Sequence, residues 1–223
     1  MYVTTANRAV GFWSAILATV FSLTYVVAQL AEWLGWLGSD GGPASSSTTL
    51  GIAVLLTPSL LLGSSFLVLL VSVHQAAPRE KKVWSQAALA FGTVYAVLIS
   101  MTYFVQLTFV GPRIAEARTA GIEVFLFVPF DSFLYSVDLL GYSFMSLATL
   151  FAAPVFATHG AERIARWFLI ANGLLLPFLV GQLYLNVLIW PASAWAITFP
   201  GATGSIALLF HRSEVGALRA TVA

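Results

Sequence analysis

The chain contains no cysteine and unusually few charged residues. Lys, Arg, Asp and Glu together make up 9% of its 223 residues, whereas soluble domains carry about 25%. The lack of cysteine excludes disulfides, thiolate nucleophiles and cysteine-ligated zinc or iron–sulfur sites. The shortage of charge excludes an ordinary soluble domain, whose surface needs polar cover. The net charge of +1 provides no field that would attract nucleic acid, so we expect no nucleic-acid partner.

Motifs of enzymes and cofactor sites are also lacking. The chain has no Gly-x-Ser-x-Gly nucleophile elbow and no phosphate-binding Gly-x-x-x-x-Gly-Lys loop. Its three histidines, His74, His159 and His211, end apolar runs without the paired spacing of metal ligands. The sequence therefore indicates no catalytic residue and no metal site, identifies no cofactor, and favours a non-enzymatic role.

Long apolar runs dominate the composition. Apolar residues account for 59% of the chain, the mean hydropathy is +0.90, and a membrane-spanning helix needs about 20 apolar residues. Six runs reach this length: 9–31, 50–73, 83–110, 132–158, 167–190 and 192–210. The sequence therefore predicts an all-α, polytopic membrane protein, with residues 1–223 forming a single six-helix integral-membrane domain. Pro200 and Gly201 in the last run allow either a kink or an unwound helix, and the seven tryptophans near the ends of runs are typical of an interfacial belt.

Basic residues are distributed unevenly between the connections. Only Arg113 and Arg118 fall on one side of the predicted membrane. Eight fall on the other side: Arg8, Arg79, Lys81, Lys82, Arg163, Arg166, Arg212 and Arg219. Because Lys and Arg concentrate in cytoplasmic connections, we predict a multi-pass protein of the cell membrane with both termini in the cytoplasm.

Asp138 is the only charged residue well inside a predicted span. A carboxylate at the centre of a spanning helix costs about 2.5–3.5 kcal/mol, so it must face the bundle interior, be protonated or have donors nearby. Asp131, Tyr135, Asp138 and Tyr142 are three or four residues apart and share one helix face. This face either binds a ligand, ion or proton, or holds a structural Asp that is hydrogen-bonded to neighbouring helices.

Other polar residues fall at a similar depth, in the outer half of the predicted bilayer. Their convergence predicts a pocket, and hydrogen bonds between helices are the alternative explanation, above all for the amides. The predicted ligand-binding residues are Asp138, Asp131, Tyr142, Tyr135, Gln29, Glu32, Gln106, Gln182 and Asn186.

Small residues recur every fourth position at Ala88, Gly92 and Ala96. Such a stripe lets helices approach closely, either within the chain or against a second copy or a partner membrane subunit. Three functions remain open on the sequence alone. The first is binding or transport of a small molecule, ion or proton through the polar pocket. The others are a non-catalytic accessory subunit of a membrane complex, and a lipid-modifying enzyme that uses Asp138 or Glu32 as acid or base.

Overall fold

A computed structural model describes residues 3–213, and all elements in that range are helical. Six segments are long and apolar enough to cross a membrane, which confirms the predicted all-helical, six-span architecture. These segments are Thr5–Trp33, Thr49–Ala76, Arg79–Ala115, Phe133–Val155, Glu162–Gly181 and Asn186–Arg212. Arg219 and the predicted cytoplasmic C-terminus lie outside the described residues.

The first two segments are single helices, and the other four are built from consecutive helical pieces. The single helices are α1 (Thr5–Trp33) and α2 (Thr49–Ala76). The side-chain oxygens of Thr4 and Thr48 cap them, each accepting a backbone N–H at 3.1 Å. The remaining pieces are η1 (Arg79–Lys81), α3 (Lys82–Val105), the π-helix η2 (Gln106–Val110), α4 (Gly111–Ala115), η3 (Glu123–Phe125), α5 (Phe133–Ala152), η4 (Ala153–Val155), α6 (Glu162–Gly173), α7 (Leu176–Gly181), η5 (Asn186–Leu188), α8 (Ile189–Ala192) and α9 (Trp195–Arg212).

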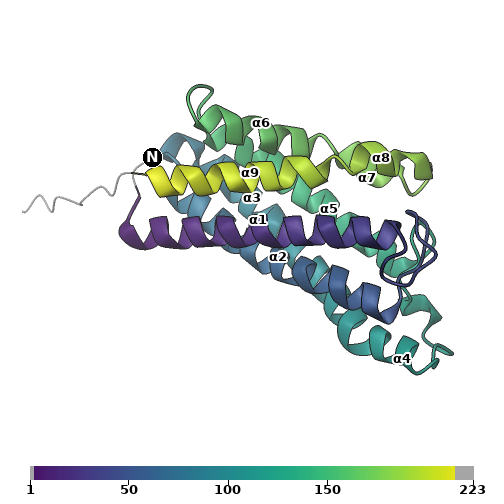
Figure 1. Ribbon diagram of the computed structural model, residues 1–223. Helices are drawn as coiled ribbons and strands as arrows, with labels where there is room; N and C mark the ends of the chain where they lie inside the picture. Colours follow the sequence, from purple (N-terminus) through teal and green to yellow (C-terminus); the bar gives the residue numbers. More distant parts are fainter. Residues whose placement is uncertain (1–2, 214–223) are drawn as a thin grey trace, which may run out of the picture.

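The long helices form a closed ring. Going around it, α1 packs on α2, α2 on α3, α3 on α5, α5 on α6, α6 on α9, and α9 again on α1 (Figure 1). Aromatic side chains fill the middle of the ring. The Phe66 ring lies 5.9 Å from that of Tyr95 and 5.1 Å from that of Phe199, so α2, α3 and α9 meet there. Any space inside the ring must therefore lie toward one of its ends.

The small-residue stripe on α3 is used inside the chain. Ala88, Gly92 and Ala96 are buried. A Cβ atom at Gly92 would lie 2.2 Å from Leu70 Cδ1 and 3.9 Å from Ala148 Cβ, so α2 and α5 both pack closely here. Packing within the chain accounts for the stripe, and a partner subunit on this face would have to displace α2 or α5.

The fifth and sixth segments meet at a different place from the one predicted. The fifth segment ends at Gly181 and the sixth begins at Asn186, so the connection lies at 182–185 rather than at Trp190–Pro191. Pro177, in the first turn of α7, lacks the N–H that would continue α6, and Pro191 is accommodated inside α8. Beyond this, α9 runs through Pro200 as one continuous helix, so the unwound alternative is wrong.

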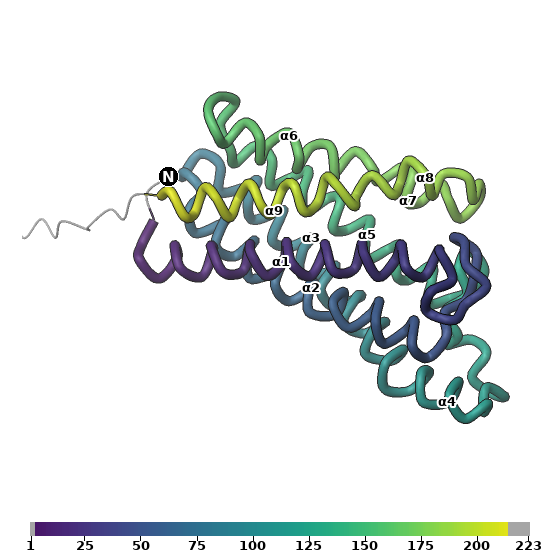
Figure 2. Tube along the Cα trace, in the orientation of Figure 1, coloured from purple at the N-terminus to yellow at the C-terminus, as the bar shows by residue number. Residues whose placement is uncertain are grey.

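Both described termini lie at the same end of the bundle (Figures 1 and 2). The Arg8 guanidinium of α1 donates to the backbone oxygen of His211 in α9. This end, which we call the basic end, carries the helix termini and connections that hold Arg8, Arg79, Lys81, Lys82, Arg163, Arg166 and Arg212. Arg113 and Arg118 lie at the opposite end, with the 34–48 connection. The six-span path therefore separates the basic residues as the sequence predicts, and which end faces the cytoplasm stays a prediction.

Candidate functional site

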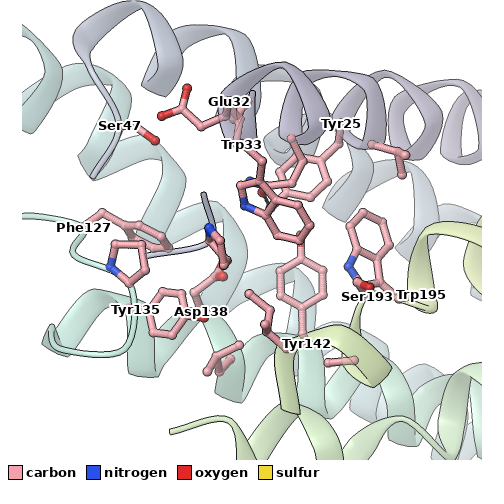
Figure 3. A pocket seen from close by; sticks show the side chains of 18 of the residues that line it. Tyr25, Glu32, Trp33, Ser47, Phe127, Tyr135, Asp138, Tyr142, Ser193 and Trp195 are labelled. Carbon is pink, nitrogen blue, oxygen red and sulfur yellow. Dashed lines mark hydrogen bonds between the residues drawn. The ribbon is translucent and has the colours of Figure 1, made fainter. Parts of the chain in front are cut away.

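A cavity of about 280 Å³ opens inside the ring, toward the end opposite the basic end (Figure 3). Its walls come from α1, α2, α3, α5, α7, α8 and α9. Pro43, Ser45 and Ser47 of the 34–48 connection and Phe127 and Pro129 of the segment before α5 cover it. Ligand pockets usually measure about 300–1,000 Å³, so this one suits a small ligand.

Six of the nine predicted ligand-binding residues line this one cavity. They are Gln29, Glu32, Tyr135, Asp138, Tyr142 and Gln182. The other three lie elsewhere. Asp131 is exposed because it precedes Ser132, the N-cap of α5, and does not continue the helix face. Asn186 is exposed because the chain turns after Gln182 and the spacing of four no longer implies one face. Gln106 is buried outside the lining, where its Nε2 donates to the Phe125 backbone oxygen at 2.7 Å.

Asp138 is held in the cavity wall by α5. Ser132 Oγ accepts the Tyr135 N–H at 3.2 Å and starts the helix, and its 3.6-residue repeat then buries Tyr135, Asp138 and Tyr142 on one face. Asp138 is 6% exposed, and its Oδ1 has no hydrogen-bond partner among the described residues. One carboxylate oxygen is therefore left without a donor inside the bundle.

Tyrosines surround this carboxyl group. Five tyrosines from α1, α3 and α5 lie close enough to interact with its charge: Tyr25, Tyr95, Tyr103, Tyr135 and Tyr142. The Tyr103 hydroxyl donates to the Tyr142 hydroxyl at 3.1 Å. The carboxyl group thus lies among phenolic side chains, none of which donates a hydrogen bond to its Oδ1 in the described structure.

Glu32 is a second buried acid on the same cavity. It lies near the C-terminal end of α1, is 2% exposed, and neither of its carboxylate oxygens has a partner in the described part of the chain. Gly51 of α2 makes room for it, since a Cβ there would lie 2.7 Å from Glu32 Oε2. Figure 3 shows Glu32 beside Ser47 and Asp138 across the cavity.

The two amides of the cavity are hydrogen-bonded, unlike the acids. Gln29 Oε1 accepts the Tyr25 hydroxyl at 3.0 Å within α1. Gln182 Oε1 accepts the Tyr135 hydroxyl at 3.1 Å, and its Nε2 donates to the Leu179 backbone oxygen at 3.2 Å. Hydrogen bonding between helices, the alternative to a ligand site, thus accounts for Gln182, which links α5 to the end of α7. It does not account for the two carboxylates.

Aromatic rings form much of the remaining wall. The Trp195 ring lies 5.2 Å from that of Tyr25 and 6.1 Å from that of Tyr142, and Trp33 also lines the cavity (Figure 3). The sequence assigns both tryptophans to the interfacial belt and does not predict that they line this cavity. Trp33 follows Glu32 directly, and this adjacency is the signal that could have indicated it, whereas Trp195 has none.

The charges of the lining are all of one sign. It contains Glu32 and Asp138 and, within the described residues, no Lys, Arg or His. Residues 3–213 also hold no group of three or more His, Cys, Asp or Glu side chains able to bind a metal ion. No protein-family model, curated protein or solved structure matches this chain. Its function must therefore be argued from the cavity itself.

Proposed function

We propose that this protein binds a small molecule in the cavity, within the outer half of the membrane. One observation carries the proposal: two buried acids, Glu32 and Asp138, line an internal space, and oxygens of both have no donor among the described residues. Buried polar groups are nearly always hydrogen-bonded, and leaving one unpaired costs free energy. Ligand pockets are lined mainly by apolar and aromatic side chains with a few polar groups, and the wall around these two acids has that composition.

The other functions open on the sequence gain no specific support. An accessory subunit needs a partner-binding face, and the small-residue stripe is covered by α2 and α5. A lipid-modifying enzyme needs an activated nucleophile, and the described lining places no histidine or lysine beside its serines. Transport needs a second opening toward the basic end and stays a prediction.

Binding is tested by filling the cavity. Ala192 is buried in its wall, and Ala192→Phe would occupy part of the space. Ala194 is exposed and outside the lining, so Ala194→Phe is the matched control. The probes are benzyltrimethylammonium, its uncharged carbon isostere neopentylbenzene, and phenylacetate, each titrated into purified protein in detergent with thermal unfolding as the readout. We expect saturable stabilisation by at least one probe in wild type and Ala194→Phe, and none in Ala192→Phe. Failure of all three probes in wild type, or an equal response of Ala192→Phe, would contradict the proposal.

The position in the outer half depends on the proposed orientation, with the basic end in the cytoplasm. Because the chain has no cysteine of its own, a single introduced cysteine reports directly on the orientation of the protein in the membrane. Asp40 and Thr158 are exposed in connections at opposite ends. A membrane-impermeant maleimide added to intact cells should label Asp40→Cys, and should label Thr158→Cys only after lysis. The reverse pattern would place the cavity in the inner half.

A further inference from the structure

We propose that the ligand of this cavity is a small organic ammonium ion, with one positive charge on an apolar or aromatic body. The inference rests on the proposed function and adds the chemical class of the ligand to it. Three independent features of the lining support it: the sign of its charges, its aromatic walls and its aliphatic stretches.

The first feature is a pair of buried acids without a basic partner in the described lining. Glu32 and Asp138 are both buried, and no basic side chain among the described residues lines the cavity with them. A buried carboxylate is stable only when it is paired, hydrogen-bonded or protonated. The described side chains leave three of the four carboxylate oxygens without a partner, namely both of Glu32 and Oδ1 of Asp138. A cationic ligand would offset the negative charge that these acids carry when ionised.

The second feature is the aromatic wall of the cavity. Trp195 contacts both Tyr25 and Tyr142, with ring centroids 5.2 and 6.1 Å apart, and Trp33 lies nearby (Figure 3). The faces of aromatic rings attract ammonium groups, tryptophan most strongly, and aromatic cages are the usual means of recognising alkylated ammonium ions. The faces of the same rings carry negative partial charge and would disfavour an anion.

The third feature distinguishes an organic cation from a metal ion. Calcium takes about 6–8 oxygen ligands and magnesium about six. Here the acids stand on separate helices, α1 and α5, and much of the wall between the polar groups is aliphatic, including Leu55, Leu139 and Leu179. Hydrocarbon walls and a volume of about 280 Å³ suit the body of an organic ligand rather than a hydrated ion.

The test compares binding of one organic cation with binding of its uncharged isostere. Benzyltrimethylammonium and neopentylbenzene have the same shape and differ by the replacement of nitrogen with carbon, so any difference in affinity reports on charge. Binding to the purified full chain is measured by quenching of tryptophan fluorescence and by calorimetry. We expect the cation to bind at least about tenfold more tightly than the isostere, and phenylacetate not to bind.

Substitutions identify the groups responsible. Glu32→Gln and Asp138→Asn keep the shape of each side chain and remove its charge, and each should weaken binding of the cation about tenfold or more while leaving the affinity of the isostere unchanged. Asp131→Asn is the matched control, since Asp131 is an exposed acid outside the lining, and it should change neither affinity.

The outcomes separate the two proposals. If the cation and the isostere bind equally, or if Glu32→Gln and Asp138→Asn bind the cation as wild type does, the ammonium inference is overturned and the binding function stands. If phenylacetate binds most tightly, the inference is overturned as well. If no probe binds to wild type, the proposed function itself fails, and the inference with it.

Discussion

Two polar clusters are buried in this bundle, and they differ in how completely their hydrogen bonds are made. In the Asn172 cluster (Thr149, Asn172 and Thr198), Asn172 Nδ2 donates to Thr149 Oγ1 at 3.2 Å and Asn172 Oδ1 accepts from Thr198 Oγ1 at 3.0 Å. These bonds tie α6 to α5 and α9. In the cavity, by contrast, the described residues leave oxygens of Glu32 and Asp138 without donors.

The contrast indicates what each cluster is for. An amide whose oxygen and nitrogen both have partners on neighbouring helices stabilises their packing, typically by about 0.6–2 kcal/mol per contact. It leaves no unpaired atom for a ligand. Unpaired carboxylates beside a cavity add little to packing, but they provide charge that a ligand can neutralise. Stability should therefore depend on the Asn172 cluster, and binding on the acids of the cavity.

The largest expected loss of stability comes from the helix contact beside Asn172. A Cβ at Gly173 would lie 2.6 Å from Leu150 Cβ and 3.0 Å from the Ser146 backbone oxygen, so Gly173→Ala would push α6 away from α5. We expect it to lower the free energy of unfolding by about 1–3 kcal/mol, measured by denaturant titration in detergent. In Gly63→Ala the new Cβ would have its nearest neighbour at 3.8 Å, so this control should stay close to wild type. Equal effects of the two variants would contradict the close packing.

The second largest loss of stability is expected when the hydrogen bonds of the Asn172 cluster are removed. Asn172→Ala leaves Thr149 Oγ1 and Thr198 Oγ1 without their shared amide, and we expect a loss of about 1–2 kcal/mol in the free energy of unfolding. Asn186 is exposed, so Asn186→Ala is the control and should change stability by no more than about 0.5 kcal/mol. If Asn172→Ala unfolded like wild type, the hydrogen bonds of the Asn172 cluster would not be needed for stability.

Asp138→Asn should have a smaller effect on stability, in spite of equally deep burial. Because Asp138 Oδ1 has no partner in the described structure, removing the charge breaks few bonds and relieves the cost of burying an ion. We expect the free energy of unfolding to stay within about 1 kcal/mol of wild type, measured without probe. A loss as large as that of Asn172→Ala would assign Asp138 a structural role and remove the contrast between the clusters.

Asp131→Asn should have the smallest effect of all. Asp131 shares the sequence spacing of Tyr135, Asp138 and Tyr142, but it lies exposed before α5. Stability should change by no more than about 0.5 kcal/mol. The free energy of unfolding and the affinity for the cationic probe are both measured for this variant. A loss of either would show that the face of Tyr135, Asp138 and Tyr142 extends to Asp131.

Hydropathy was sufficient to predict the six spans, because the length of apolar sequence needed to cross a bilayer is fixed physically. It did not locate the connection at 182–185, because that turn carries no charge and its polar residues alternate with apolar ones inside a longer apolar run. Helical spacing predicted the face of Tyr135, Asp138 and Tyr142. The same spacing failed for Asp131 and Asn186, because it has no meaning outside a continuous helix.

The aromatic wall of the cavity could not be predicted from the sequence, for a different reason. A tryptophan near the end of an apolar run has the same pattern whether its ring faces lipid, as expected of a belt, or turns inward as Trp33 and Trp195 do. The cover from 43–47 and 127–129 was equally hidden, because periodicity does not specify where an irregular connection folds back.

The most direct test of a negatively charged, accessible cavity uses one cysteine in its wall. Ser193 lines the cavity, and Ser193→Cys would be the sole thiol of the chain. Its rates of modification by 2-(trimethylammonium)ethyl methanethiosulfonate and by 2-sulfonatoethyl methanethiosulfonate are each divided by the rate for a free thiol in solution. We predict a preference of about tenfold or more for the cationic reagent, reduced when Glu32→Gln and Asp138→Asn are added. Equal normalised rates, or no reaction with either reagent, would contradict the account.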